Sequence, residues 1–126
     1  TGFVSGDLKA SLLQAADVFV LPSYYENFGI AVAEAMVAGT PVVISDQVHI
    51  WEEVRQAEAG WVSTCEVAAV AEALRSALQS SSERERRGAL AKAYALEHYS
   101  WPTIAQQMIL SYEQILATPS PRKPQR

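Results

Sequence analysis

The amino-acid sequence predicts an α/β fold with a parallel sheet and a helical C-terminal portion. Two short apolar runs, 18–21 and 42–44, flank one apolar segment of helical length, 30–38. Pro22 follows the first run and Gly39 precedes the second, so turn residues mark the joints between these segments. Strand, loop, helix and strand in this order form a βαβ unit, in which the two strands lie parallel.

The segment 30–38 is expected to be an enclosed helix, because it is apolar on every face except at Glu34. An ionised carboxylate in such surroundings is costly unless it accepts hydrogen bonds. A helix that begins directly after a parallel strand also directs its unpaired N–H groups into the crevice above the sheet. The amides around Phe28, Gly29 and Ile30 are therefore candidate donors to an anionic ligand.

Beyond this unit the sequence becomes increasingly helical. A short helix is predicted over 51–58 and a strand over 60–63. Apolar residues at helical spacing predict an amphipathic helix over 67–78. We therefore expect a doubly wound sheet of three or four parallel strands.

Two longer helices are predicted near the C-terminus. Ser82 and Glu85 have capping-box spacing, and the helix that they open is expected to run to Tyr94 or Glu97. Ser100 is expected to cap the final helix. One apolar stripe of that helix is predicted to face the core: Trp101, Ile104, Ala105, Met108, Tyr112, Ile115 and Leu116.

Two glutamates separated by seven residues bracket the start of the helix over 30–38. Glu34 accepts bonds either from nearby backbone amides or a hydroxyl, or from ligand hydroxyls, as acidic groups do with ribose. Glu26, in the preceding loop, is either a solvated acid or cap, or a ligand group. Gly29 would let a phosphate approach the backbone closely, since it has no Cβ. The placement of the two carboxylates suits gripping two parts of one extended ligand better than acid/base work on a single bond.

The stretch from Glu26 to Val43 reads E-N-F-G-I-A-V-A-E-A-M-V-A-G-T-P-V-V. It resembles the motif of the retaining GT-B glycosyltransferases of the GT4 group, E-x-F-G-x-x-x-x-E-A-M-A-x-G-x-P-V-V. The resemblance extends to about Leu116. Further segments are similar to neighbouring elements of the same domain: a strand end at 3–6, a helix at 8–16, a strand at 17–23 and a closing helix at 99–116.

The resemblance implies that residues 1–117 are part of a Rossmann-like, nucleotide-sugar-binding domain, the C-terminal domain of the GT-B fold. Such enzymes transfer a sugar from a nucleotide-sugar to an acceptor hydroxyl with retention of configuration, generally without a metal. At matching positions, Glu26 contacts the donor sugar and acts in catalysis by stabilising positive charge on it, and Glu34 holds the ribose. The other implied donor-binding residues surround the diphosphate: Asn27, Phe28, Gly29 and Ile30.

Several parts of such an enzyme have no counterpart in this sequence. These are the N-terminal acceptor domain, and the Gly-rich turn and basic residue that clamp the diphosphate. In place of the paired glycines that many relatives carry after the second strand, residues 45–50 read S-D-Q-V-H-I. Because the chain starts at Thr1, we expect a fragment or processed product that is inactive alone. Two alternatives remain open: a non-catalytic nucleotide-sugar-binding module or remnant that needs a partner chain, and a generic nucleotide-binding domain.

Composition argues against several other classes of protein. The chain has 126 residues, of which 49% are hydrophobic and 19% charged, as in one globular domain. Its net charge of -4 argues against nucleic-acid binding. A single cysteine, Cys65, cannot form an internal disulfide, so a cytoplasmic location is expected. Membrane contact is not expected, because no apolar run approaches the length that crosses a bilayer.

Two expectations concern the ends of the chain. Residues 118–126 contain three prolines and three basic residues and no apolar pattern, which predicts a disordered tail. The sheet is expected to have an open edge near Phe3 and Val4, because earlier strands of the domain have no counterpart here. Since open edges and apolar patches recruit partners, we expect the chain to self-associate or to bind a partner chain.

Overall fold

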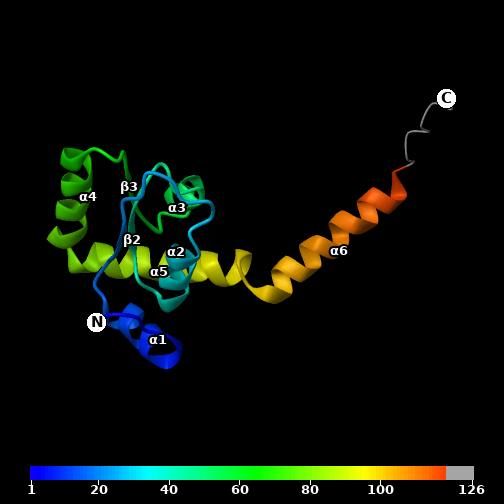
Figure 1. Cartoon of the computed structure of the whole chain (residues 1–126), viewed down its shortest axis with the longest axis horizontal. Coiled ribbons are helices and arrows are strands. Elements are labelled where there is room, and N and C mark those ends of the chain that lie inside the picture. The colour runs from blue at the N-terminus through cyan, green and yellow to red at the C-terminus, as the bar shows by residue number, and fades with distance from the viewer. Residues whose placement is uncertain (119–126) are drawn as a thin grey trace.

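The structure is a computed structural model that describes residues 1–118, so all but the first residue of the predicted tail lies outside the described residues. Helices and strands alternate at first and helices follow (Figure 1). Their bounds are α1 Gly6–Ala15, β1 Phe19–Leu21, α2 Ile30–Ala38, β2 Val42–Ser45, α3 Trp51–Gln56, β3 Gly60–Ser63, α4 Val67–Gln79, α5 Ser81–His98 and α6 Trp101–Ala117.

The sheet has three parallel strands in the order β1-β2-β3, within the three or four predicted. Its central strand, β2, is buried along its whole length, which explains its uninterrupted run of β-branched residues.

Phe3 to Gly6 forms no strand, contrary to the prediction. Gly2 and Gly6 have positive φ of 70° and 56°, which interrupts extended backbone, and no neighbouring strand pairs with this segment in residues 1–118. The open edge on this side is therefore β1.

The core lies between the sheet, α2 and α5. Val32 and Met36 of α2 pack with Ile44 of β2 and with Ala91 and Ala95 of α5. Small residues on α5 allow the two helices to approach closely. A Cβ added at Gly88 would lie 2.2 Å from the carbonyl oxygen of Gly39 at the end of α2. The position of α2 therefore depends on a backbone-to-backbone contact with α5.

The α2 helix has the predicted bounds, but it is not enclosed. Val32, Ala35 and Met36 are buried, whereas the side chain of Ile30 is 69% exposed and Val37 is also exposed. The helix carries apolar residues on almost every face, yet the elements within residues 1–118 cover only one side of it. The prediction of an enclosed helix was therefore wrong, and Glu34 lies on a partly open face.

The two C-terminal helices differ from the prediction in their start and their surroundings. Ser80, not Ser82, caps α5: its Oγ accepts from the N–H of Glu83 at 3.2 Å. Its extended backbone, with φ -135°, places it before the first helical turn, whereas Ser82 already lies within the helix. The α5 helix also ends slightly later than predicted, at His98.

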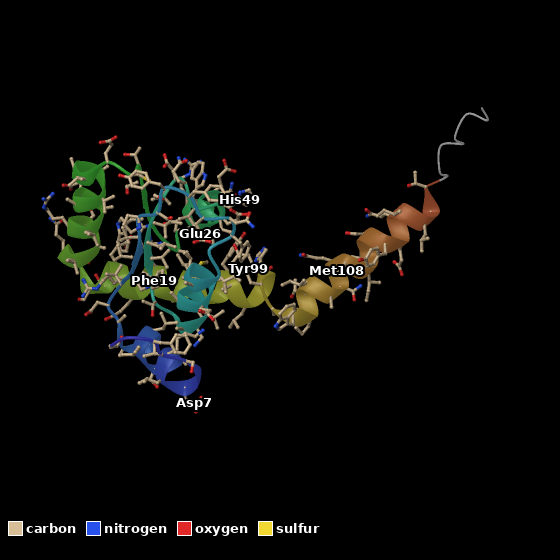
Figure 2. The ribbon with its side chains drawn as sticks, viewed as in Figure 1. Asp7, Phe19, Glu26, His49, Tyr99 and Met108 are labelled. Carbon is tan, nitrogen blue, oxygen red and sulfur yellow. The ribbon has the colours of Figure 1, made fainter. Side chains whose placement is uncertain are left out.

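Ser100 caps α6 as predicted, accepting from the N–H of Thr103 at 3.3 Å. The helix projects away from the body of the molecule (Figure 1), and Met108 lies far from the sheet (Figure 2). None of its residues is buried, and Trp101 and Leu116 are 82% and 85% exposed. The prediction that its apolar stripe faces the core was wrong, because within residues 1–118 little beyond the end of α5 packs against it.

Candidate functional site

The loops that follow β1 and β2 are joined at the carboxyl edge of the sheet. Glu26 forms an isolated parallel bridge with Val48. The N–H of Glu26 donates to the carbonyl of Gln47 at 3.2 Å, and the N–H of His49 donates to the carbonyl of Glu26 at 3.1 Å. Figure 2 labels Glu26 and His49. The backbone of Glu26 is thus fixed, and its half-buried side chain starts from a defined position above the sheet.

A second contact joins the loop after β1 to the end of β2. The hydroxyl of Ser45, at the end of β2, donates to the carbonyl of Ser23 at 2.5 Å. Residues 45–50, which lack the paired glycines of many relatives, therefore hold the loop that carries Glu26.

Gly29 shapes the start of α2. It is the N-cap residue with φ 88°, in the left-handed region that favours glycine. It is also buried, and an added Cβ would lie 3.0 Å from Val48 Cγ1 and 3.6 Å from Glu26 Cγ. Among residues 1–118 no side chain caps this helix, so first-turn N–H groups around Ile30 remain available to a ligand or to water. The N-terminus has the form expected of an anion-binding position.

Glu34 is paired with a residue that the sequence did not indicate. Its Oε1 lies 2.6 Å from Nζ of Lys9 on α1, and the two side chains are 39% and 43% exposed. Neither a backbone amide nor a hydroxyl binds Glu34 within the described residues, so that interpretation is not supported. An exposed pair of this kind contributes about 0–1 kcal/mol, so ligand hydroxyls can replace Lys9 at little cost.

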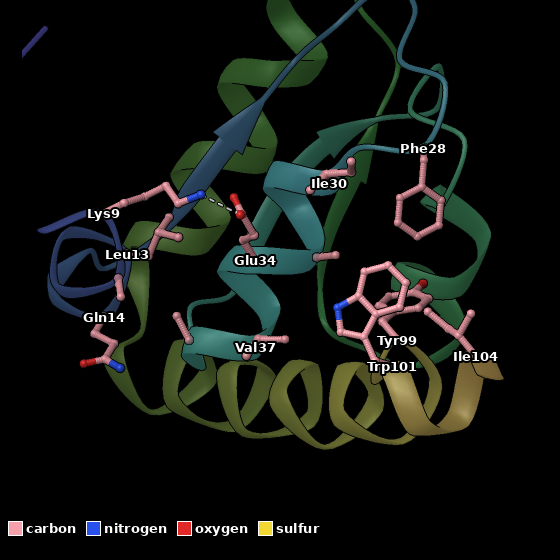
Figure 3. A pocket seen from close by; sticks show the side chains of 13 residues that line it. Lys9, Leu13, Gln14, Phe28, Ile30, Glu34, Val37, Tyr99, Trp101 and Ile104 are labelled. Atoms are coloured by element: carbon pink, nitrogen blue, oxygen red, sulfur yellow. Dashed lines mark hydrogen bonds and ion pairs between the residues drawn. The ribbon is translucent and has the colours of Figure 1, made fainter. Parts of the chain in front are cut away.

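A cavity of about 600 Å³ adjoins Glu34, between α1, α2 and the junction of α5 with α6 (Figure 3). Its volume is in the range typical of small-molecule sites. Three predicted site residues line it: Phe28, Ile30 and Glu34. Glu26, Asn27 and Gly29 do not, so the structure divides the predicted set between this cavity and the edge of the sheet.

Aromatic contacts join Phe28, which lines the cavity, to residues at the C-terminal helices. The rings of Phe28 and Tyr99 meet edge to face with centroids 5.5 Å apart, and Tyr94 meets Tyr99 in the same way at 5.7 Å. Burial raises the pKa of the Tyr99 hydroxyl, so this group stays neutral over the physiological range. Tyr99 thus acts as an uncharged support for Phe28, a contact that no sequence spacing indicates.

Neither a metal-binding cluster nor a membrane-spanning helix is found among the described residues. Within residues 1–118, no three histidine, cysteine, aspartate or glutamate side chains gather in a way that would hold a metal ion. None of the helices in that range combines the length and apolar character needed to cross a bilayer.

Comparisons with known proteins identify the family of the chain. The model of the family described as glycosyl transferases group 1 matches residues 1–94. The chain is 39% identical over 113 residues to an uncharacterized glycosyltransferase of Methanocaldococcus jannaschii, covering 89% of this chain and 29% of that protein. It is 40% identical over 114 residues to a phosphatidyl-myo-inositol mannosyltransferase of Mycobacterium leprae, covering 89% of this chain and 30% of the relative.

A similar solved structure is sucrose-phosphate synthase from Thermosynechococcus elongatus. It superimposes with a TM-score of 0.82 at 31% identity, over 93% of this chain and 30% of that one. The chain thus spans less than a third of the length of these relatives. It belongs to the group 1 family of glycosyltransferases and comprises part of the C-terminal domain of their GT-B fold.

Proposed function

We propose that residues 1–117 are the donor-binding portion of a glycosyltransferase that moves a sugar from a nucleotide-sugar to an acceptor hydroxyl with retention of configuration. The observation that carries the proposal is the α2 N-terminus, which no side chain caps and which lies beside the fixed residue Glu26. A nucleotide diphosphate is an anion, which unpaired N–H groups and the positive end of a helix dipole attract. The activity of the longer protein is part of this proposal.

Each glutamate holds a different part of the donor in this proposal. Glu26 accepts from hydroxyls of the transferred sugar above the carboxyl edge of the sheet. Glu34 exchanges Lys9 for the ribose hydroxyls, and the apolar side chains of Phe28 and Ile30 form the walls beside it. The diphosphate lies between the two carboxylates, at the start of α2.

The same groups favour the transition state. As the anomeric bond breaks, negative charge grows on the leaving diphosphate and positive charge grows on the sugar. The first-turn N–H groups of α2 stabilise the first charge and Glu26 stabilises the second, more strongly than in the ground state. The proposal involves no metal. It also places the protein in the cytoplasm, in keeping with the single cysteine, Cys65.

Binding experiments on the 126-residue chain test these assignments. Calorimetric titration with uridine, guanosine and adenosine diphosphate sugars, and with the matching free diphosphates, is expected to identify one preferred nucleotide. Glu34→Gln should weaken the nucleotide-sugar and the free diphosphate alike, by about tenfold, because both carry the ribose. Glu26→Gln should weaken only the nucleotide-sugar. Glu113→Gln, on the exposed α6, is the matched control.

Two outcomes would contradict the proposal. If Glu26→Gln leaves nucleotide-sugar binding as it was while a free nucleotide still binds, the chain is a general nucleotide-binding domain. If no nucleotide-sugar binds at all, this chain does not hold the donor by itself.

A further inference from the structure

A groove follows the open edge of β3, away from the cavity beside Glu34. Two cavities of about 510 and 450 Å³ lie next to each other there, with Arg55, Val62 and Ser63 lining both of them. We call this feature the β3 groove. Its other lining residues come from the loop after β2, from β3 itself and from α3, α4 and α5: Asp46, Gln47, Trp51, Gly60, Trp61, Thr64, Ala69, Glu72, Ala73, Ser76 and Arg87.

The backbone of β3 offers both a donor and an acceptor to this groove. The N–H of Asp46 donates to the carbonyl of Ser63 at 2.9 Å, so the backbone groups of Ser63 face β2. Because backbone groups alternate in direction along a strand, those of Trp61 also face β2. Gly60 and Val62 then face the open edge. Nη1 of Arg87 donates to the carbonyl of Gly60 at 2.5 Å, which leaves the N–H and the carbonyl of Val62 for a ligand.

Two arginines in the groove are held by aromatic stacking. The guanidinium of Arg55 lies 4.6 Å from the ring centroid of Trp51, and that of Arg87 lies 4.6 Å from the ring of Trp61. Arg87 is further held by Glu83 at 2.8 Å, whereas Arg55 has no ion pair among residues 1–118. Stacking fixes the plane of a guanidinium and leaves its N–H groups directed outward, so Arg55 presents unused donors.

Ser63 supplies a polar atom that the folded chain leaves unsatisfied. Its Oγ is buried and has no hydrogen-bond partner among residues 1–118, and other atoms of the residue line both cavities. A buried hydroxyl without a partner is unfavourable, so Ser63 destabilises the wall of the groove without itself being open to a ligand there.

The charges of the groove decide the class of ligand. Arg55 and Arg87 are balanced by Asp46 and Glu72, so the lining attracts neither a phosphate nor an ammonium group overall. Hydroxyl groups both donate and accept, which matches a lining that mixes arginine donors, carboxylate acceptors and an unpaired strand edge. We infer that the β3 groove binds a neutral, hydroxyl-rich carbohydrate. This site has a different lining from the proposed donor site, because neither Glu26, Glu34 nor any of residues 27–30 lines it. The two sites meet at Gln47, whose carbonyl accepts from the N–H of Glu26.

Nuclear magnetic resonance of the ¹⁵N-labelled chain tests this site. Maltotriose and mannotriose serve as neutral probes, and inorganic phosphate as the anionic one. At least one trisaccharide is expected to shift the indole N–H signals of Trp51 and Trp61 and the amide of Val62. Arg55→Gln should weaken that binding about fivefold or more, through the loss of charged donors. Arg86→Gln, an exposed arginine outside the groove, should leave it unchanged.

Ser63→Ala separates folding from binding, because its Oγ is closed to the groove. It should raise the melting temperature by removing an unsatisfied buried hydroxyl and leave trisaccharide binding unchanged. Four results would overturn the site: unchanged affinity in Arg55→Gln, tighter binding of phosphate than of either trisaccharide, shifts confined to residues 22–30, or no shift at about 50 mM sugar, well above the usual range of ligand affinities.

Discussion

Gly29 shows how one residue couples the shape of the site to stability. Its φ of 88° strains any other residue, and an added Cβ would also press on Val48 at 3.0 Å. Gly29→Ala is expected to lower the free energy of unfolding by about 2–3 kcal/mol, measured by urea denaturation. Gly6→Ala is the control, because φ there is 56° but nothing lies within 4 Å of the added Cβ.

That control isolates backbone strain, which costs about 1 kcal/mol for one residue in the left-handed region. Equal losses in the two variants would show that the contact with Val48 adds nothing. A larger loss at Gly29 shows that the entry to α2 is closely packed.

Glu83 makes stability depend on pH in the acid range. Hydrogen bonds from Arg86 and Arg87 lower the pKa of Glu83 from 4.5 to about 2. These bonds need the charged carboxylate, so their contribution is complete above pH about 4.5 and is lost as the pH falls toward 2. Glu83→Gln should flatten the fall in stability over this window, as measured by urea denaturation at a series of pH values.

A control variant identifies the source of that effect. Glu113→Gln lies on α6, where no ion pair is found among the described residues, and it should keep the acid-dependent fall of the parent chain. An identical pH profile for the parent chain and Glu83→Gln would assign the fall to other carboxylates.

At the residue scale, motif positions were predictable and tertiary partners were not. The apolar run with a single acid placed Glu34 on α2, and its place in the family motif predicts a role in holding the ribose. Its partner Lys9 lies 25 residues earlier on another helix, and no local pattern connects them. The capping error has a similar origin: consecutive serines, 80–82, all suit a cap, and only the backbone angles single out Ser80.

At the scale of elements, the contact between α2 and α5 gives a clear test. Alanine is a better helix former than glycine by about 1 kcal/mol, so Gly88→Ala would stabilise an isolated helix. In the folded chain the added Cβ would lie 2.2 Å from the carbonyl of Gly39. Overpacking should prevail, with a loss of about 1–3 kcal/mol in urea denaturation. A gain in stability would show that the two helices separate easily.

The elements themselves were largely predictable, because their signals are local. The strand over 60–63 and the helix over 30–38 have the predicted bounds, since glycine, proline and apolar runs mark both. The surroundings of α6 were not predictable. An apolar stripe indicates that a surface is suited to burial, but not whether the covering element is present in residues 1–118.

At the scale of the whole molecule, exposed apolar surface predicts association. The stripe on α6 includes Trp101, Ile115 and Leu116, all largely exposed, and β1 leaves one edge of the sheet open. Light scattering is expected to show dimers or larger species at micromolar concentrations. Ile115→Lys combined with Leu116→Lys should reduce this association, whereas Glu113→Gln should not.

A uniform monomer across that concentration range would contradict the expectation. It would mean that the apolar stripe tolerates water without a partner, as isolated exposed apolar residues do on many proteins.

The α6 helix extends from a joint beside the contact between Phe28 and Tyr99. The helix has 17 residues, a length of about 25 Å at 1.5 Å per residue, and its inner end begins two residues after Tyr99. A rotation of about 10° at this joint moves the far end by about 4 Å but shifts the ring of Tyr99 by only a fraction of an ångström. A displacement at the outer end of α6 would therefore reach Tyr99, and the Phe28 ring that Tyr99 contacts, only as a much smaller shift.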